Sequence, residues 1–375
     1  MKKIYGYILG RETKLSAAEI EGVYKANNCP YQVIFCQNDI LIVESEEEFF
    51  DLLGGSVKLF EVKLTNQALS ATNLKGLINV GGKVVFGISM YGQFAKKNIV
   101  IELGKKIKAE FKEEKINSRF LYPKNTSLSS VEIDKNKVLK KGGEIIIIQD
   151  GVSNFIGKTL KVQDFETYSR MDYGRPASDA FSGMMPPKLC QMMINLSGVK
   201  PYANTKFLDP FCGSGTMLMM AAYLGYKNIY GSDISAKAAQ NSLKNLDWYK
   251  KEFDKDFSCQ IDEKDVLSLE GNAEFELIVS EGYLGKPKTQ KTTQVEIENE
   301  ISQLKDFYSK VLAKLSKILK PSGVIVIAIP FYVPGNRKLF LDPLVPEELD
   351  LLGKELYRRE NQIVGRQILV LKKGV

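Results

Sequence analysis

The chain has 375 residues, more than one ordinary hydrophobic core accommodates, so two or three domains are expected. Hydrophobic residues make up 44% and charged residues 26%, as in soluble globular proteins. No apolar run approaches the roughly 20 residues that a membrane-spanning helix needs. Lys2 and Lys3 open the chain, but Arg11 and Glu12 follow too early for the apolar core of a signal peptide. The sequence therefore predicts a cytoplasmic protein.

Histidine is absent, and the five cysteines form no C-x-x-C pair. Without histidine the chain has no Ser-His-Asp or Cys-His nucleophile, and it lacks the side chain that most transition-metal sites use. The odd number of cysteines and their spacing argue against a disulfide framework and against a zinc site, so we expect no metal. Any general base must be a carboxylate, Lys, Tyr or Cys.

Positive charge is concentrated in one segment. Lys and Arg exceed Asp and Glu by 52 to 45 in the whole chain, and the segment from Lys96 to Lys141 holds 13 basic and 6 acidic residues, the same surplus of seven. A localised basic face is the pattern expected for a surface that binds phosphate backbones, with Lys105 and Lys108 as candidate contacts. A solvated lysine-rich helix explains the same charges equally well.

Residues 1–60 have the pattern of a small, ferredoxin-like α/β unit. Strands are predicted over residues 4–9, 33–35 and 40–43. A helix is expected from Ala17 to about Lys25, with Ser16 as its N-cap and Glu19 at the capping-box position. A second, short helix is expected over residues 46–53.

Residues 61–165 form a second predicted α/β unit. Apolar residues recur at helical spacing from Ile99 to Phe111, with lysines on the opposite face. Strands are predicted over residues 84–89, 118–122, 131–133 and 144–148. Residues 166–185 then read as a linker that is rich in polar and aromatic side chains.

Strands and helices alternate over residues 186–375. Helices are predicted from residue 186 or 187 to 196 and over residues 217–224, 236–246 and 296–319. Strands are predicted over residues 207–208, 228–232, 275–280, 324–329 and 368–371. Apolar strands that alternate with helices are typical of a parallel sheet covered on both faces. This part therefore predicts a Rossmann-like domain with a mostly parallel, doubly wound α/β sheet.

A glycine-rich turn follows the first strand of this domain. It reads Asp-Pro-Phe-Cys-Gly-Ser-Gly-Thr from Asp209 to Thr216, and its glycines allow a ligand to approach backbone N–H groups at a helix N-terminus. A dinucleotide fingerprint needs a third glycine where this chain has Leu218. The carboxylate of Asp209 would repel a pyrophosphate, but it suits the ammonium of the methionine end of S-adenosylmethionine. The sequence thus predicts this cofactor rather than a nicotinamide dinucleotide, whereas a tight turn without a ligand is the structural alternative.

Two further acidic positions follow later strands. Asp233 comes directly after the second strand, where a carboxylate accepts hydrogen bonds from ribose hydroxyls. Asp265 lies where a third strand should end and is a candidate acceptor for the adenine amine, although an ordinary surface turn is an equal alternative. The predicted cofactor-binding set is Asp209, Phe211, Gly213, Ser214, Gly215, Thr216, Asp233, Ile234, Asp265 and Val266.

The segment from Asp209 to Thr216 resembles the first motif of the THUMP-domain tRNA guanine-N2 methyltransferases. Arg175-Pro176 and the run Met185-Pro186-Pro187-Lys188-Leu189 resemble the segment that leads into the catalytic domain of that family. The resemblance implies a class I methyltransferase domain over residues 186–375 and a THUMP-like RNA-binding domain over residues 61–165. It also implies that the THUMP-like unit grips tRNA near its 3′ end and presents a guanine at position ten or nearby.

The family's Asp-Pro-Pro-Tyr motif after the fourth strand is replaced in this chain. The strand over residues 275–280 runs into Glu-Gly-Tyr-Leu-Gly, which puts Glu281 on the acid, Gly282 on the first proline and Tyr283 one residue early. An acid accepts the amine hydrogens and the released proton, and an aromatic ring stacks the extruded base. Glu281 and Tyr283 are therefore the predicted catalytic residues. Because Glu is longer than Asp and Gly is looser than Pro, their geometry cannot be copied from the family.

Several alternatives stay open at this point. The chain could be a DNA amine methyltransferase, a degenerate RNA-binding homologue without turnover, or an enzyme with a changed target amine. Arg170 and Arg175 either contact RNA phosphates or pin the linker to the domains. The predicted partner is tRNA, the need for a small activator subunit stays open, and the chain is otherwise expected to be monomeric. Cys212 is explained by the turn in which it lies, since no histidine is present to activate it.

Overall fold

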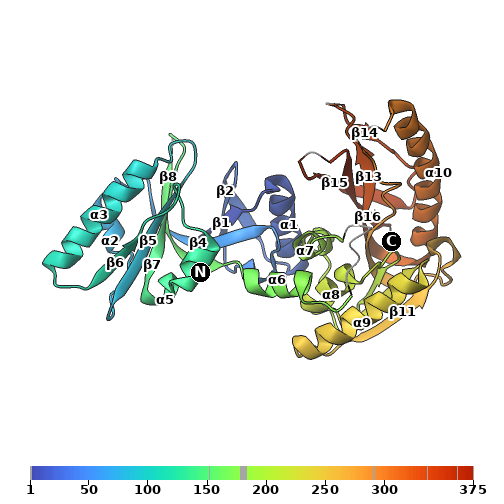
Figure 1. Cartoon of the computed structure of the whole chain (residues 1–375), viewed down its shortest axis with the longest axis horizontal. Coiled ribbons are helices and arrows are strands. Elements are labelled where there is room, and N and C mark those ends of the chain that lie inside the picture. The colour runs from blue at the N-terminus through green and yellow to red at the C-terminus, as the bar shows by residue number, and fades with distance from the viewer. Residues whose placement is uncertain are drawn as a thin grey trace. The chain divides into compact units, whose positions relative to one another are not determined.

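The computed structural model describes residues 2–151, 153–177, 184–289, 292–335, 337–360 and 362–374. The chain forms two compact units, of which the first comprises Met1–Ala17 and Asn28–Glu166, and the second comprises Ala18–Asn27 and Thr167–Val375 (Figure 1). Helix α1 (Thr13–Ala26) contributes residues to both. Each unit is built around its own eight-stranded sheet. Within the described residues, no helix is both long enough and apolar enough to cross a membrane.

The first unit is one continuous sheet with the strand order β2-β3-β1-β4-β8-β7-β5-β6. Its strands are β1 (Lys3–Leu9), β2 (Tyr31–Gln37), β3 (Ile40–Ser45), β4 (Ser56–Thr65), β5 (Val84–Tyr91), β6 (Ser118–Leu121), β7 (Gly142–Gln149) and β8 (Asn154–Val162). Strand β5 runs parallel to β6 and β7, and the other pairs are antiparallel. The domain boundary expected at residue 60 lies inside β4, so the residues on its two sides share one sheet.

Helices cover this sheet because its central strands are apolar on both faces. Ile145 and Ile147 of β7 pack in one cluster with helix α3 (Lys97–Glu113), whereas Ile146 and Ile148 pack on the opposite side. The predicted spacing of α3 is confirmed, since its buried positions are Val100, Leu103, Gly104, Ile107 and Phe111. The shorter helices are α2 (Ala71–Lys75), α4 (Ser130–Lys135) and α5 (Val138–Lys141).

Three local predictions for this region are wrong. Helix α1 begins at Thr13, so Ser16 lies inside it and donates to the carbonyl of Glu12 instead of capping. The strand predicted over residues 131–133 is helix α4, because Ser129 and Glu132 form a capping box that starts a helix there. The helix predicted over residues 46–53 is reduced to the 3₁₀ turn η1 (Phe50–Leu52). The capping box thus outweighs the apolar pattern at α4, and η1 has no side-chain cap at its start.

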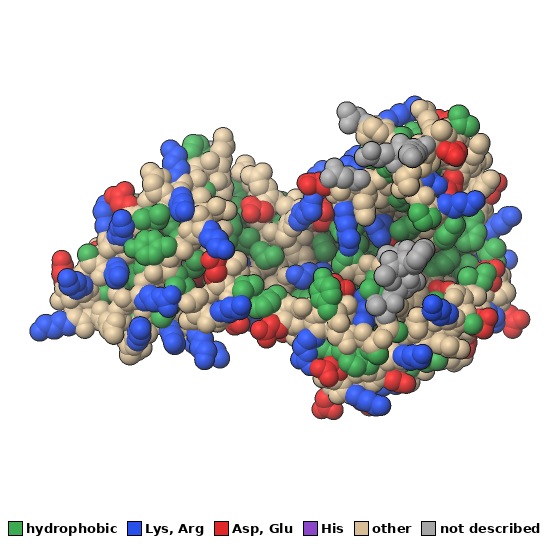
Figure 2. Space-filling model, viewed as in Figure 1, with side chains coloured by type: hydrophobic (Ala, Val, Ile, Leu, Met, Phe, Trp, Pro, Cys, Tyr) green, Lys and Arg blue, Asp and Glu red, His purple; other side chains and the backbone are tan. Residues whose placement is uncertain are grey.

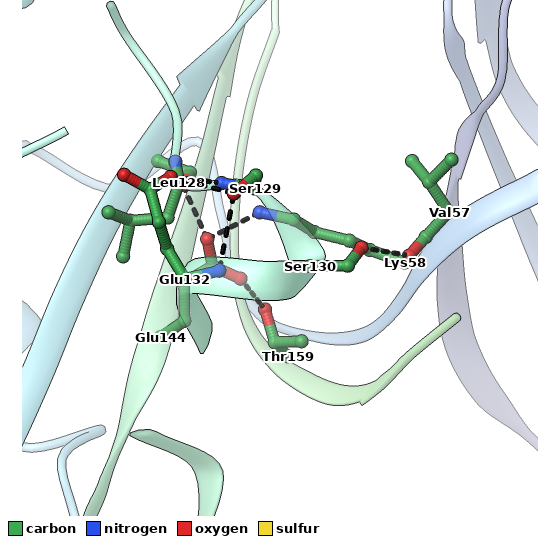
Figure 3. Close-up of polar contacts among 9 residues, drawn as sticks. Val57, Lys58, Leu128, Ser129, Ser130, Glu132, Glu144 and Thr159 are labelled. Atoms are coloured by element: carbon green, nitrogen blue, oxygen red, sulfur yellow. Dashed lines mark hydrogen bonds and ion pairs between the residues drawn. The ribbon is translucent and has the colours of Figure 1, made fainter. Parts of the chain in front are cut away.

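A buried ion pair fixes the middle of the first sheet (Figure 3). The ammonium of Lys58 on β4 lies 2.5 Å from Oε1 of Glu144 on β7, and their side chains are 2% and 0% exposed. The hydroxyl of Thr159 donates to the other carboxylate oxygen at 2.6 Å. Ser89 also donates to Glu144 and accepts the backbone N–H of Leu128 at 2.9 Å. Every strand from β4 to β5 in the sheet order thus contributes to one hydrogen-bonded network.

Glu144→Gln should destabilise the protein by about 3–5 kcal/mol, because it leaves the ammonium of Lys58 buried without an opposite charge. The double variant Lys58→Met/Glu144→Gln should recover a large part of this loss. Lys106→Gln, which removes an exposed pair with Glu102, should change stability by at most about 0.5 kcal/mol. Urea unfolding monitored by circular dichroism measures all three. A loss as small as that of Lys106→Gln would show that the buried pair contributes no more than a surface pair.

The second unit is a mixed sheet with the strand order β11-β10-β9-β12-β13-β16-β15. Its strands are β9 (Lys206–Asp209), β10 (Asn228–Asp233), β11 (Ser258–Glu263), β12 (Phe275–Glu281), β13 (Leu319–Tyr332), β15 (Leu349–Tyr357) and β16 (Val364–Lys373), and the short β14 (Leu339–Phe340) pairs with β13 off this path. The five strands from β11 to β13 are parallel, whereas β16 and β15 are antiparallel. The predicted Rossmann-like, mostly parallel sheet is confirmed.

The helices of this unit are α6 (Phe165–Tyr173), α7 (Pro187–Leu196), α8 (Thr216–Tyr223), α9 (Ala236–Glu252) and α10 (Gln294–Ile318). Helices α7 and α10 both contact β13, so this strand is buried on two faces. Helix α6 occupies part of the predicted linker. A 3₁₀ turn, η2 (Val266–Ser268), follows β11.

The order of the strands determines where a ligand can bind. The chain moves outward from β9 to β10 and β11 and then returns to the other side of β9 as β12. At such a reversal the connections leave β9 and β12 in opposite directions, which opens a crevice at the carboxyl ends of the two strands. Asp209 ends β9 and Glu281 ends β12, so both predicted acids lie at this crevice.

Candidate active site

A cavity of about 630 Å³ lies at the carboxyl ends of β9, β10 and β12. This volume is within the range of pockets that hold small molecules. Every residue of the predicted cofactor set except Gly215 lines it, and so do Glu281 and Tyr283. Met184, Met185, Cys190, Met217 and Phe307 supply apolar surface. Segments that are far apart in the sequence therefore meet at one hollow of the second unit.

Asp209 is the most deeply buried acid of the cavity, with 2% of its surface exposed. Its Oδ1 accepts the hydroxyl of Ser280 at 2.5 Å and the backbone N–H of Phe211 at 3.2 Å. Burial raises the pKa of Asp209 to about 7, although these two hydrogen bonds oppose the shift, and the nearby charges of Asp233 and Glu281 raise it further. The group therefore changes its charge near neutral pH.

Two glycines shape the turn that follows β9, and both have a left-handed backbone. Gly213 has φ +51°, and no atom of the described residues outside the turn's own neighbours lies within 4 Å of the position where a Cβ would stand. Gly215 has φ +84°, and a Cβ there would lie 2.5 Å from the hydroxyl of Ser242. Gly213 thus leaves open space at the cavity, whereas Gly215 permits close packing of the turn against α9.

The second and third predicted acids are held by backbone N–H groups. Asp233 accepts the N–H of Gly213 at 2.9 Å with one oxygen and that of Ser235 at 2.9 Å with the other. Asp265 is the N-cap of η2 and accepts the N–H of Leu267 at 2.9 Å. Ile234 is 73% exposed although it is apolar, and it lines the cavity beside Asp233.

Glu281 is paired with an arginine that the sequence does not single out. The Nε of Arg366 on β16 donates to Oε1 of Glu281, and the two side chains are 11% and 20% exposed. Burial raises the pKa of Glu281, and the charges of Arg366 and Arg359 act in the opposite direction. Arg366 follows Glu281 by 85 residues, so only the register of β12, β13 and β16 brings them together.

The turn after Glu281 is closely packed rather than loose. A Cβ at Gly282 would lie 2.3 Å from the hydroxyl of Tyr308 on α10, and this hydroxyl donates to the carbonyl of Tyr283 at 2.7 Å. Glu300 of α10 accepts the backbone N–H of Lys286 at 2.7 Å. The expectation that Gly282 makes the turn looser is wrong, because Tyr308 occupies the space that a larger residue would need. The ring of Tyr283 is half-exposed at the cavity.

The two arginines of the predicted linker pin it to the second unit. The side chain of Arg175 is fully buried and contacts Thr216 and Asp172, which places it out of reach of an RNA phosphate. Arg170 pairs with Glu252 and lies 4.7 Å from the ring centre of Phe253. For Arg175 these contacts favour the structural alternative, whereas Arg170 has a side chain that is 52% exposed and its contact with RNA stays a prediction. Lys105 and Lys108, in contrast, are exposed on α3 of the first unit, where Figure 2 shows many basic side chains.

Asn245 of α9 is another residue of the site that sequence reasoning missed. Its amide nitrogen donates to the carbonyls of Ala177 and Ser214, both at 2.8 Å, and its oxygen accepts the N–H of Ala177 at 2.9 Å. The polar atoms of a buried asparagine need hydrogen-bond partners, so such a residue on a helix can indicate a bridge between segments, here between residue 177 and the turn after β9. Cys212 is buried, and burial raises the pKa of its thiol well above the usual range, which disfavours the reactive thiolate.

Taken together, the sheet order and the cavity define the fold of class I methyltransferases. The solved structure of TrmN from Thermus thermophilus has the same fold over the whole chain, with a TM-score of 0.54, 15% identity and 100% of both chains covered. The structure of SMU.472, solved as a complex with SAH, is similar at a TM-score of 0.53 and 10% identity, covering 100% of this chain and 98% of that chain.

The sequence comparisons indicate which methyltransferases this chain is similar to. Residues 177–333 match the family model of the RMKL-like methyltransferase domain, and residues 88–244 match a model described as DNA methylase. The chain is 28% identical over 194 residues to the tRNA (guanine(10)-N2)-dimethyltransferase of Methanothermobacter thermautotrophicus, which is 52% of this chain and 50% of that protein. It is 29% identical to the enzyme of the same name from Methanocaldococcus jannaschii, over 56% of this chain and 54% of that one.

These relatives confirm the resemblance to tRNA guanine-N2 methyltransferases that the sequence indicates. The chain spans about half the length of the curated relatives that it matches.

Gly215→Ala should destabilise the protein more than Gly213→Ala. Both positions have a left-handed backbone, which costs an alanine about 1–2 kcal/mol. Only Gly215 adds a collision with Ser242, for which overpacking costs about 1–3 kcal/mol more. Thermal unfolding of the two variants measures the difference. Equal melting temperatures would show that the turn is not packed against α9 as described.

Proposed function

We propose that the chain transfers a methyl group from S-adenosylmethionine to the exocyclic amine of a guanosine in tRNA, at position ten or nearby. The observation that carries this proposal is that Asp209 and Glu281 end two neighbouring parallel strands and line the same cavity. One acid is suited to a cationic methyl donor and the other to a target amine. The two relatives named as tRNA (guanine(10)-N2)-dimethyltransferases support the choice of substrate.

The residues of the cavity fit the cofactor. The open space at Gly213 lets a ligand approach the turn, and Asp209 supplies an anion for the donor's ammonium. Asp233 and Asp265 offer acceptors for the ribose hydroxyls and the adenine amine, and the exposed Ile234 offers apolar contact to the adenine ring. The remaining contacts fall to Phe211, Ser214, Gly215, Thr216 and Val266. When it is bound, S-adenosylmethionine supplies an electrophilic methyl group.

The chain's own residues prepare the amine. A guanine exocyclic amine is a weak nucleophile because its lone pair is delocalised into the ring. Glu281 would accept one amine hydrogen and take up the proton that nitrogen releases as the nitrogen–carbon bond forms and the donor's methyl–sulfur bond breaks, which leaves a neutral thioether. The half-exposed ring of Tyr283 stacks the extruded base. Alignment of the amine with the methyl group supplies the rest of the rate.

The first unit supplies the RNA-binding surface in this proposal. We infer that residues 61–165, which share one sheet with residues 1–60, are a THUMP-like RNA-binding part of the first unit, joined by residues 166–185 to the methyltransferase domain of residues 186–375. It holds folded tRNA near its 3′ end through shape and phosphate contacts. Within this picture the protein is cytoplasmic and monomeric, apart from a small activator subunit.

Mass spectrometry of nucleosides tests the function. Bulk tRNA is incubated with the protein and methyl-labelled S-adenosylmethionine, and duplex DNA serves as the second substrate. We expect labelled N2-methylguanosine in the tRNA, and its loss with Glu281→Gln, which keeps the shape of the side chain. Label in DNA alone would favour the DNA amine methyltransferase, which the match over residues 88–244 suggests. tRNA binding without any label would indicate a degenerate homologue.

The affinity for S-adenosylmethionine should rise with pH. The pKa of Asp209 is about 7, so the carboxyl is neutral below this value and binds the donor's ammonium weakly. Well below pH 7 the affinity should increase roughly tenfold per pH unit, and it should level off above pH 7. Asp209→Asn should bind weakly at every pH. Isothermal titration calorimetry from pH 5 to 7.5 measures both proteins, and a flat wild-type profile would contradict the assignment of Asp209 to the ammonium.

Lys105→Gln/Lys108→Gln should weaken tRNA binding. If the two ammonium groups neutralise RNA phosphates, the slope of log affinity against log salt should also fall, by about one for each lysine replaced. Lys305→Gln/Lys310→Gln removes the same charge from exposed positions of α10 and is the control. Filter binding at several salt concentrations gives the slopes. Identical slopes for the two double variants would show that the weaker tRNA binding comes only from the lower net charge of the chain.

A further inference from the structure

Glu281 is paired with a cation that does not line the cavity. Glu281 is one of the lining residues, whereas Arg366 is not. Arg366 donates through Nε to Oε1 of Glu281. Among the described residues, no hydrogen bond reaches the second oxygen, Oε2. One oxygen of the carboxylate is therefore held by Arg366, and the other can accept a hydrogen bond from a ligand.

The register of the sheet fixes this arrangement. Glu281 lies opposite Ala328 of β13, and β13 pairs with β16, on which Arg366 lies opposite Pro330. The guanidinium also lies 5.7 Å from the ring centre of Tyr357 on β15. Arg366 is thus positioned by backbone pairing and by an aromatic neighbour, independently of any ligand. A residue placed in this way can restrain Glu281, whose side chain is longer than an aspartate.

The electrostatic surroundings of Glu281 need such a cation. Asp209 lies on β9 beside β12, and the charge of Glu281 disfavours the charged form of Asp209. Cys190 of α7 and Tyr308 of α10 also face Glu281, and both are buried with raised pKa values, so they stay neutral. Burial raises the pKa of Glu281, and Arg366 and Arg359 are the positive groups that oppose it. Arg366 is the one in direct contact.

We propose that Arg366 is a positioning residue for the methyl transfer, which fixes the Glu281 carboxylate in its charged form and directs its free oxygen to the target amine. This inference rests on the function proposed above. It also accounts for the Glu-Gly-Tyr sequence, because a longer acid that is tethered by Arg366 can present an acceptor where a shorter acid does so unaided.

Kinetics of Arg366→Gln test the role in turnover. We expect kcat at pH 7 to fall by about tenfold or more, within the range that a general base contributes, with little change of KM for tRNA or donor. The acidic limb of the rate profile should move to higher pH, because Glu281 then protonates more easily. Arg366→Lys should restore part of the rate. Lys372→Gln removes a charge from an exposed position of the same strand and should leave the profile unchanged.

A double variant tests whether Arg366 affects turnover through Glu281 or independently of it. If Arg366 acts only through this carboxylate, Arg366→Gln/Glu281→Gln should be no slower than Glu281→Gln alone. If the double variant is slower than Glu281→Gln by the same factor by which Arg366→Gln is slower than the wild type, the inference is overturned. An acidic limb that does not shift in Arg366→Gln would overturn it too. Binding of S-adenosylmethionine by each variant confirms that the cavity is still folded.

A pH titration of Glu281 in the absence of substrate tests the Arg366–Glu281 pairing separately from the proposed function. The δ-carboxyl carbon of Glu281, labelled with ¹³C and assigned by comparison with Glu281→Gln, is followed by NMR against pH. The pKa of Glu281 should be higher in Arg366→Gln than in the wild type and in Lys372→Gln. A shift in a protein that methylates no RNA would leave the pairing intact and refute the function. An unchanged pKa would refute the pairing, whatever the activity.

Discussion

Two carboxylates that end neighbouring parallel strands are the constraint on which this molecule depends. Asp209 on β9 and Glu281 on β12 lie close enough to interact electrostatically because the strand order reverses between these two strands. Two acids at close range repel each other and lose solvation when they are buried. Ser280 and Phe211 offset this cost at Asp209, and Arg366 offsets it at Glu281. The layout of hydrogen bonds and charges around the cavity follows from this need.

The fold of the second unit could be predicted from the sequence because its signals are local. Apolar runs such as residues 275–280 and 324–329 can only be buried strands between helices, and β12 and β13 match them. The first unit was harder to predict. Its strands β4 and β8 carry Lys58 and Lys158 among apolar residues, and the sequence cannot show that Lys58 has a buried partner in Glu144. Likewise, the β-branched residues of α4 favour a strand, but a capping box makes this segment a helix.

The candidate site divides in the same way. Its cofactor half follows one continuous turn after β9, so the spacing of Asp209, Gly213 and Gly215 predicts it. Its catalytic half depends on pairs that are far apart in the chain, such as Glu281 with Arg366 and Gly282 with Tyr308. No local pattern marks Arg366 or Tyr308, since each is an ordinary residue of a strand or a helix. Only the register of β13 with β16 and the packing of α10 bring them to the cavity residues Glu281 and Gly282.

The single sheet of the first unit has a consequence for how this protein is made. Strand β4 pairs with β1 on one side and with β8 on the other, and Phe60 lies opposite Thr159. A nascent chain on the ribosome therefore exposes one edge of β4 until β8 has been synthesised. Exposed strand edges invite pairing with other chains. We therefore expect the front of this protein to mature as one piece, and a fragment that stops soon after β4 to aggregate.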